Sequence, residues 1–180
     1  MVNFDNFRVY LRALEIDDYK VIHEIRKQED VILGYSKFNT FPSSENDKKW
    51  VESRIFNKDE VTCAICLKET NEVIGCIFLL DIDMHNRVAS CPLFLSDKFY
   101  GKGYAREARF LMLKYAFYER GLLRVTDYVN ENNKASLQLH KRCGYVLEGA
   151  MRSAIFKNGI RVNLCVLGCL KEDFDEIINE

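Results

Sequence analysis

The chain has 180 residues and a formal net charge of −1, with 26 lysine and arginine residues against 27 aspartate and glutamate residues. That balance excludes a nucleic-acid binder that works by bulk electrostatics, and 48% hydrophobic residues exclude a disordered chain. The length fits one domain, residues 1–180, and no apolar run reaches the roughly 18 residues of a membrane span, so we expect a cytoplasmic protein with no nucleic-acid or membrane partner.

Hydrophobic periodicity predicts four strands and two helices in the first half of the chain. The predicted strands are residues 7–14, 61–67, 73–80 and 87–95, and the predicted helices are residues 17–28 and 44–56. Asp17 and Ser44 can cap the two helices. The polar turn at 68–72 makes the two middle strands a hairpin. An aromatic-rich connection at 31–42 separates the helices.

The second half of the chain alternates helices with strands. The predicted elements are a helix that ends near Gly121, strands at 122–129, 145–151 and 162–170, a helix at 133–143 and a short acidic helix at the end. Asn133 can cap the middle helix and Gly144 can end it, while Asn158-Gly159 supplies a tight turn between the last two strands. Both halves together predict one α/β (α+β) domain around a mixed sheet.

Pro92 interrupts the predicted fourth strand. Proline has no N–H to donate to a neighbouring strand, so it marks a sheet edge or a bulge. We expect the strand to separate from its neighbour at this point and to leave backbone groups free in a cleft. An extended ligand can pair with such groups.

A glycine loop, defined here as residues 100–106 (Tyr-Gly-Lys-Gly-Tyr-Ala-Arg), joins this strand to the next helix. Successive backbone N–H groups at the positive end of a helix bind anions. Gly101 and Gly103 let the chain bend and let a phosphate approach without meeting a Cβ atom, and Lys102 and Arg106 add positive charge. The loop predicts a pyrophosphate site, although an ordinary strand-to-helix turn has the same composition.

The seven cysteines do not predict a metal site. Most of them lie in strand-like apolar patterns, which is typical of small buried hydrophobes in a reducing compartment. Cys63 and Cys66 match a C-x-x-C pattern, but residues three apart in a strand point to opposite faces. No second pair stands at zinc spacing, so we expect no metal.

Two motifs resemble those of the GCN5-related N-acetyltransferases (GNAT family). Residues 100–105 resemble the acyl-CoA motif Q/R-x-x-G-x-G/A, and residues 133–136 with 140–145 (Asn-Lys-Ala-Ser, then His-Lys-Arg-Cys-Gly-Tyr) resemble the segment N-x-x-S…Y-x-K-x-G-F. The resemblance covers almost the whole chain. It implies a central mixed, mostly antiparallel sheet of seven strands, flanked by helices and splayed between strands 4 and 5.

The resemblance also implies acetyl-CoA as co-substrate, without a metal, and direct attack of an amine on the thioester. The residues expected to bind acetyl-CoA are Leu93, Phe94, Leu95, Tyr100, Gly101, Lys102, Gly103, Tyr104, Ala105, Arg106, Asn133 and Ser136. Tyr100 stands where the motif has Gln or Arg, which removes one side-chain contact. Asn133 can serve as a helix cap as well as a ligand.

Two further departures concern the chemistry. His140 stands where many relatives carry a tyrosine that protonates the leaving thiolate, and an unperturbed imidazole pKa of about 6.5 suits that role. We therefore predict His140 as the catalytic acid, with a solvated helix histidine as the alternative. Ser90 stands where many relatives carry a glutamate base, so no general base is identified, and Asp81, Asp83 and His85 remain as proton relays.

The branch closest in motif contains ribosomal-protein N-terminal, spermidine and amino-sugar acetyltransferases. We expect the 31–42 connection to lie over the acceptor mouth, with Tyr35, Phe38 and Phe41 as substrate-binding residues. Aromatic faces with polar neighbours favour an amino sugar or a similar small amine. The alternatives are the N-terminus of a ribosomal protein, a polyamine such as spermidine, or a CoA-binding regulator without catalysis. A homodimer stays open.

Overall fold

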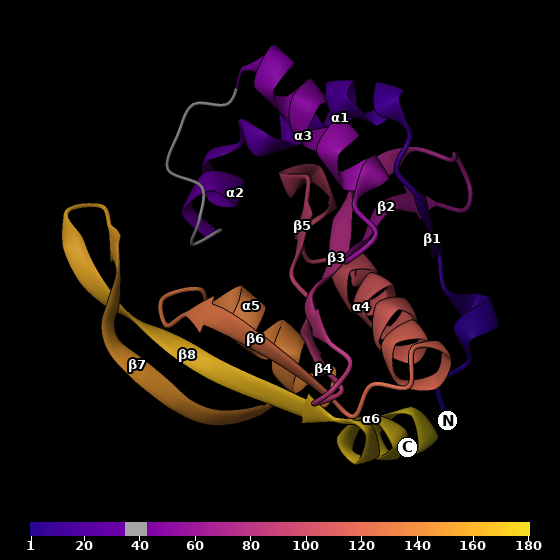
Figure 1. Cartoon of the computed structure of the whole chain (residues 1–180), viewed down its shortest axis with the longest axis vertical. Helices are drawn as coiled ribbons and strands as arrows, with labels where there is room; N and C mark the ends of the chain where they lie inside the picture. The colour runs from indigo at the N-terminus through magenta and orange to yellow at the C-terminus, as the bar shows by residue number, and fades with distance from the viewer. Residues whose placement is uncertain (35–42) are drawn as a thin grey trace.

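The structure, a computed structural model, describes residues 1–34 and 43–180. Its centre is an open eight-stranded sheet in the order β1-β2-β3-β4-β6-β8-β7, with β5 paired to β3 (Figure 1). The strands are β1 Val9–Ala13, β2 Val61–Leu67, β3 Val73–Asp83, β4 Val88–Ser90, β5 Leu93–Leu95, β6 Arg124–Asn130, β7 Val146–Lys157 and β8 Ile160–Leu170. All pairs are antiparallel except β4 with β6. The predicted class and mixed, mostly antiparallel sheet are confirmed.

Helices cover both faces of the sheet. They are α1 Tyr19–Arg26, α2 Glu29–Gly34, α3 Ser44–Phe56, α4 Tyr104–Lys114 with a π-helical extension Tyr115–Glu119, α5 Lys134–Lys141 and α6 Lys171–Asn179. Side chains of α1 and α3 pack on one face with Cys76, Phe78 and Phe94. On the other face α4 and α6 pack against Ile77 and Leu79. No helix in the described part of the chain is long and apolar enough to cross a bilayer.

Several predicted boundaries were wrong. The first helix was expected at 17–28 with Asp17 as its cap, but α1 begins at Tyr19 after a 3₁₀ turn at Ile16–Asp18. The aromatic connection was expected from residue 31, but α2 occupies residues 29–34, because Glu29 and Asp30 suit the first turn of a helix. The α3 cap is Ser43, whose Oγ accepts from the Asn46 N–H at 3.2 Å, and not Ser44. The sixth predicted strand, 145–151, is lengthened to Lys157 because it pairs with β8 along most of its length.

The seven-strand prediction is corrected to eight because Pro92 divides the predicted fourth strand into β4 and β5. β4 pairs with β6 only through Val88 and Ala89, and after the break β5 pairs with β3 instead. The sheet is therefore splayed between β5 and β6, as expected from the proline.

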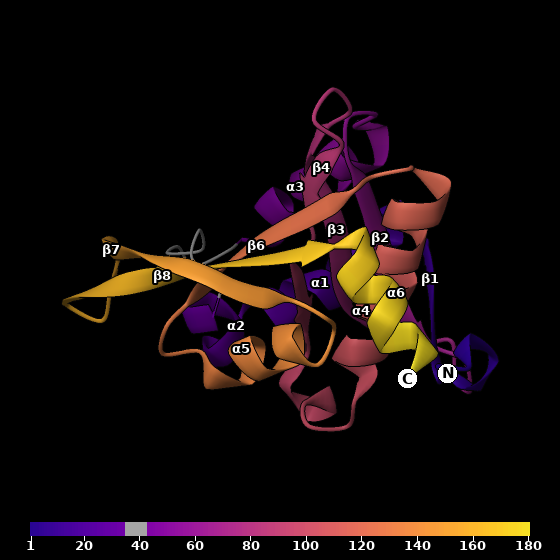
Figure 2. The ribbon, with the colours of Figure 1, turned by 90° about the horizontal axis from the view of Figure 1, so that it is seen from below.

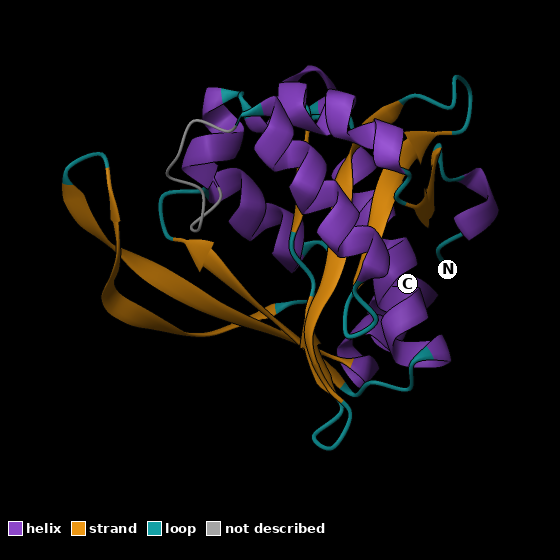
Figure 3. Cartoon of the chain, turned by 45° about the horizontal axis from the view of Figure 1, so that its top comes forward, coloured by secondary structure: helices purple, strands orange, loops and turns teal. Residues whose placement is uncertain are grey.

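The two sides of this splay differ: on one side β3 and β5 pair closely, and on the other the β7–β8 hairpin projects outward. Gly75 of β3 lies so close to β5 that a Cβ atom there would come within 2.1 Å of the Phe94 carbonyl oxygen, so only glycine permits this pairing. On the other side, the β7–β8 hairpin projects from the helix-covered part of the sheet (Figures 2 and 3). Near the hairpin turn, Lys157 Nζ donates to the Ile32 carbonyl oxygen of α2 at 2.9 Å.

Candidate active site

A cleft of about 960 Å³ lies at the splay, walled by β3, β4, β5, β6, the glycine loop and α5. It brings together most of the residues predicted to bind acetyl-CoA. Those in its wall are Leu93, Phe94, Leu95, Tyr100, Gly101, Gly103, Ala105, Arg106, Asn133 and Ser136. Lys102 and Tyr104 of the glycine loop do not line it. His140 does.

The glycine loop turns sharply into α4. Gly101 and Gly103 have φ values of +71° and +89°, a conformation that other residues adopt only with strain. The Gly103 carbonyl accepts from the amides of Arg106 and Glu107, which closes the first turn of the helix. The amides of Tyr104 and Ala105 donate to no described residue. These first-turn amides at a positive helix end can bind an anion.

Arg8 anchors the loop from the start of the chain, which the sequence reading missed. Its Nη2 donates to the Lys102 carbonyl oxygen at 2.7 Å, and its Nε donates to Glu107 Oε1 at 2.8 Å. The Arg8 backbone N–H donates to Glu107 Oε2 at 2.7 Å, and the guanidinium lies 4.6 Å from the centre of the Tyr104 ring. Nothing in the local pattern marks Arg8, because its partners lie more than 90 residues away.

Backbone groups on the β5 edge toward β6 form no hydrogen bond with the described residues. In an antiparallel pair, alternate residues point their N–H and C=O groups at the partner. Here the Phe78 N–H donates to Pro92 and the Ser96 N–H donates to Ile74, so the even-numbered residues of this segment face β3. Leu93 and Leu95 consequently direct their backbone groups into the splay, where β6 does not pair with β5.

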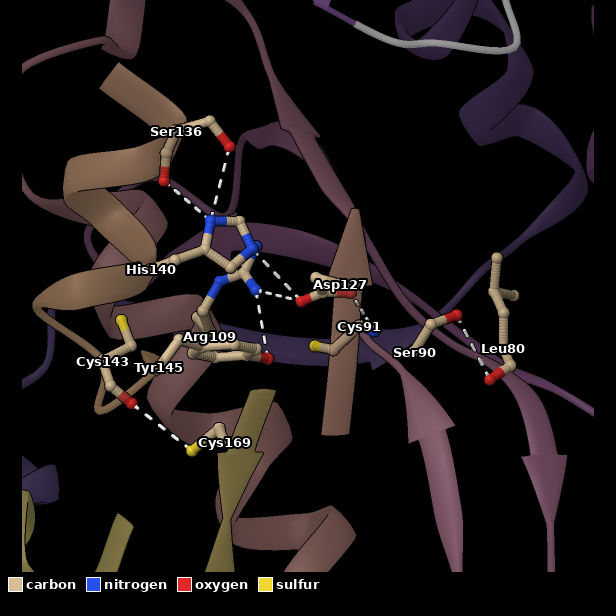
Figure 4. A network of polar contacts seen from close by, with 10 residues as sticks. All are labelled: Leu80, Ser90, Cys91, Arg109, Asp127, Ser136, His140, Cys143, Tyr145 and Cys169. Carbon is tan, nitrogen blue, oxygen red and sulfur yellow. Dashed lines mark hydrogen bonds and ion pairs between the residues drawn. The ribbon is translucent and has the colours of Figure 1, made fainter. Parts of the chain in front are cut away.

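A buried polar network lies on the β6 side of the break (Figure 4). Asp127 of β6 is 5% exposed; it accepts from the Cys91 N–H at 2.7 Å and from Arg109 Nη1 at 2.6 Å. Arg109, 2% exposed, also donates to the Tyr145 hydroxyl at 3.2 Å. His140 Nε2 lies 3.2 Å from Asp127 Oδ2. Asp127 therefore holds the residue before Pro92, the α4 helix and the α5 helix together.

Burial and neighbouring charges set the pKa values of the groups in this network. Burial alone would raise the pKa of Asp127, but Arg109 and His140 more than offset it and hold the pKa well below its usual value. Burial and the Arg109 charge lower the pKa of His140. Burial raises the pKa of Tyr145 far above the ordinary phenol value. Asp127 and Arg109 are thus an ion pair beside a neutral phenol at neutral pH.

His140 is not the solvated histidine of the alternative reading, because it is 3% exposed. Its Nδ1 lies 2.7 Å from the Ser136 carbonyl oxygen, and its ring packs edge-on against Tyr145. Both ring nitrogens thus face acceptors of the protein. These contacts favour a positioning role, and the prediction that His140 is the acid stays a prediction.

Asn133 is the cap of α5, since its Oδ1 accepts from the Ser136 N–H at 3.0 Å. Its proposed contact with a ligand stays a prediction. Tyr35, Phe38 and Phe41, predicted for the acceptor, lie outside the described residues. Among the described residues, no group of three or more His, Cys, Asp or Glu side chains is placed to hold a metal ion.

Comparison with known proteins gives a consistent result. A model of the acetyltransferase (GNAT) domain matches residues 8–146. The SPbeta prophage-derived uncharacterized N-acetyltransferase YokL of Bacillus subtilis (strain 168) is 30% identical over 166 residues, 92% of this chain and 91% of that protein. The spermidine N(1)-acetyltransferase of Vibrio cholerae is 27% identical over 154 residues, 86% of this chain and 88% of the relative.

The fold also matches solved structures. The crystal structure of a spermidine N-acetyltransferase from Vibrio cholerae in complex with CoA and spermine superposes with a TM-score of 0.85 at 23% sequence identity. The match covers 93% of this chain and 98% of the other. At this identity the likeness concerns the fold.

Proposed function

The chain belongs to the acetyltransferase (GNAT) family, and from that premise we propose that it transfers the acetyl group of acetyl-CoA to the primary amine of a small molecule. One observation carries the proposal. The β5 edge that faces the splay and the first turn of α4, through Ala105 and Arg106, line one continuous cleft. A strand edge followed by an anion-binding helix end is complementary to a pantetheine amide chain followed by a pyrophosphate.

Backbone groups of the cleft fit acetyl-CoA, although Tyr100 does not match the Gln or Arg of the family motif. The Leu93 and Leu95 backbone groups can pair with the pantetheine amides, and the amides of Tyr104 and Ala105 can bind the pyrophosphate. When bound, acetyl-CoA supplies an acyl group activated as a thioester. A backbone N–H of β5 beside the thioester carbonyl would stabilise the negative charge that develops on its oxygen.

The acceptor end of the cleft has mixed charge. Asp30 and Asp81 line it together with Arg54 and Lys157. Arg54 forms an ion pair with Glu60, and Lys157 donates to a carbonyl of α2. This balance favours a small hydroxylated or amino-acid-like amine over a polycation. A polyamine is the second candidate, because the relative from Vibrio cholerae is named a spermidine N(1)-acetyltransferase.

A panel of amines tests the function. Release of the CoA thiol should be measured with amino sugars, amino acids, spermidine and short peptides at equal concentrations. We expect small hydroxylated or amino-acid-like amines to exceed spermidine by at least about tenfold in kcat/KM, which is about 1.4 kcal/mol. A preference for spermidine would reverse the choice of acceptor. Acetyl-CoA binding without thiol release for any amine would instead favour a CoA-binding regulator.

Two His140 variants separate proton donation from positioning. Removal of a general acid costs about 10²–10⁴-fold in kcat. Because both ring nitrogens already face protein acceptors, we expect His140→Phe to lower kcat by less than about tenfold and His140→Gln, which can still donate to Asp127, to recover most of that. Steady-state kinetics at saturating acetyl-CoA provides the measurement. Losses above about 10²-fold in both variants would make His140 the acid.

A further inference from the structure

The general base that the sequence reading left open has a candidate in β3. The register between β3 and β4 shifts between Leu80 and Asp83, so that β3 carries one more residue than β4 across this interval. This is a β-bulge, a feature that redirects a side chain and is frequent next to active sites. Asp81 lies in the bulge with φ of +52°, an uncommon conformation for a residue with a side chain.

The bulge turns the Asp81 carboxylate toward Ser90. Leu80 and Ser90 are opposite each other in the ladder, and directly opposed residues share a face of the sheet. Leu80 packs with the α1 and α3 side chains, so Ser90 is on that face too. In a regular strand Asp81 would point to the opposite face from Leu80. Instead its Oδ2 lies 3.2 Å from Ser90 Oγ.

The pair lies at the point where the splay begins. Ser90 is the last residue of β4, two positions before Pro92, and both Ser90 and Asp81 line the cleft. Figure 4 shows Ser90 turned toward Leu80 and away from the Asp127 network. Ser90 thus lies apart from that network, on the face of the sheet that carries α1 and α3.

No described lysine or arginine forms an ion pair with Asp81. The neighbouring carboxylate of Asp83 already has partners. The Asp83 carboxylate accepts from the backbone amides of His85 and Asn86, which fixes the turn after β3. Asp81 is therefore an exposed carboxylate that accepts a hydrogen bond from the Ser90 hydroxyl, and a protonated amine can form an ion pair with it.

We propose, on the basis of the proposed function, that Asp81 is the proton acceptor of the acetyl transfer and that the Ser90 hydroxyl relays the proton to it. The ammonium of the acceptor gives one proton to Ser90 Oγ as the Ser90 proton passes to Asp81. The neutral amine nitrogen then forms a bond to the acetyl carbon. The carbon–sulfur bond breaks, sulfur leaves with the electron pair and takes the second amine proton, and Asp81 later releases its proton to water.

Asp81→Asn tests this proposal without disturbing the bulge, because asparagine tolerates positive φ as well as aspartate does. With a primary alkylamine, which is mostly protonated at neutral pH, we expect kcat/KM to fall at least about tenfold. With hydroxylamine, which is mostly unprotonated at that pH, the fall should be less than about twofold, since no base is needed. Acetyl-CoA affinity by calorimetry should not change.

Two further variants complete the design. Asp83→Asn removes a carboxylate from the same strand but keeps the Oδ1 acceptor of the His85 and Asn86 amides, and it should behave as wild type. Asp81→Asn combined with Ser90→Asp returns a carboxylate to the same spot and should restore most of the alkylamine activity. Equal losses with both amines, or wild-type activity of Asp81→Asn on the alkylamine, would overturn the base assignment and leave the acetyltransferase function standing. A wild-type chain that acetylates neither amine would overturn both.

Discussion

Replacing Gly103 with valine should weaken acetyl-CoA binding by at least about 100-fold, or about 2.7 kcal/mol. Gly103 has φ of +89° at the start of α4, and a Cβ atom there would lie 3.1 Å from Arg8 Nη2, the group that holds the glycine loop. A branched side chain would therefore displace Arg8 from Lys102 and occupy the space in front of the free amides. Isothermal titration calorimetry with acetyl-CoA measures the effect.

Gly121→Val is the matched control for this variant. Gly121 also has a positive φ, +66°, but it lies after the α4 extension, where a Cβ atom would be 3.6 Å from Arg87 Nη2. Both variants should lose about 1–2 kcal/mol of stability from backbone strain, and only Gly103→Val should lose affinity. Equal affinities in the two variants would show that the loop does not bind the pyrophosphate.

The second large effect is on stability. Asp127→Ala should lower the free energy of unfolding by about 3–5 kcal/mol, because it leaves the Arg109 charge buried without its carboxylate. It also removes the acceptor of the Cys91 N–H. Urea denaturation, followed by circular dichroism, measures the change. Since the folded-state pKa of Asp127 is lowered, its stabilisation is complete above the unfolded value of about 3.9 and is lost as the pH falls below it.

The exposed ion pair between Arg124 and Glu148 is the control for the stability loss expected of Asp127→Ala. Glu148→Gln breaks the pair with Arg124 on the surface of the sheet and should cost less than about 1 kcal/mol. The double variant Arg109→Met with Asp127→Leu should recover part of the loss, because it leaves no unpaired charge. A cost of Asp127→Ala no greater than that of Glu148→Gln would contradict the role of Asp127 as the buried link between β6, α4 and the break before Pro92.

The parts of the site that the sequence predicted depend on local backbone chemistry. Gly101 and Gly103 mark a positive-φ loop, Pro92 marks a strand without a ladder on one edge, and Asn133 marks a helix start. Each of these signals involves neighbours within a few residues, so each can be read from the sequence. The binding roles assigned to these residues remain predictions.

The parts that the sequence missed depend on contacts between distant segments. Arg8 meets Glu107 across the fold, and the Arg109–Asp127 pair joins a helix to a strand 18 residues later. His140 was placed on a solvated helix face as the alternative to catalysis, yet it is buried because Tyr145 and Asp127 pack around it. The bulge at Asp81 is set by the β3–β4 register, which no single strand pattern specifies.

One end of this cleft presents backbone groups and the other presents side chains. This difference affects how the sequence can diverge. The β5 edge and the α4 amides offer groups that every non-proline residue carries, so substitutions at Leu93 or Ala105 that preserve the fold also preserve those groups. The acceptor end presents side chains, among them Asp30, Arg54 and Asp81, and each substitution there changes the charged and polar groups that an amine can contact. Such a protein can accumulate many neutral changes around one donor of acyl groups while a few replacements redirect it to a new amine.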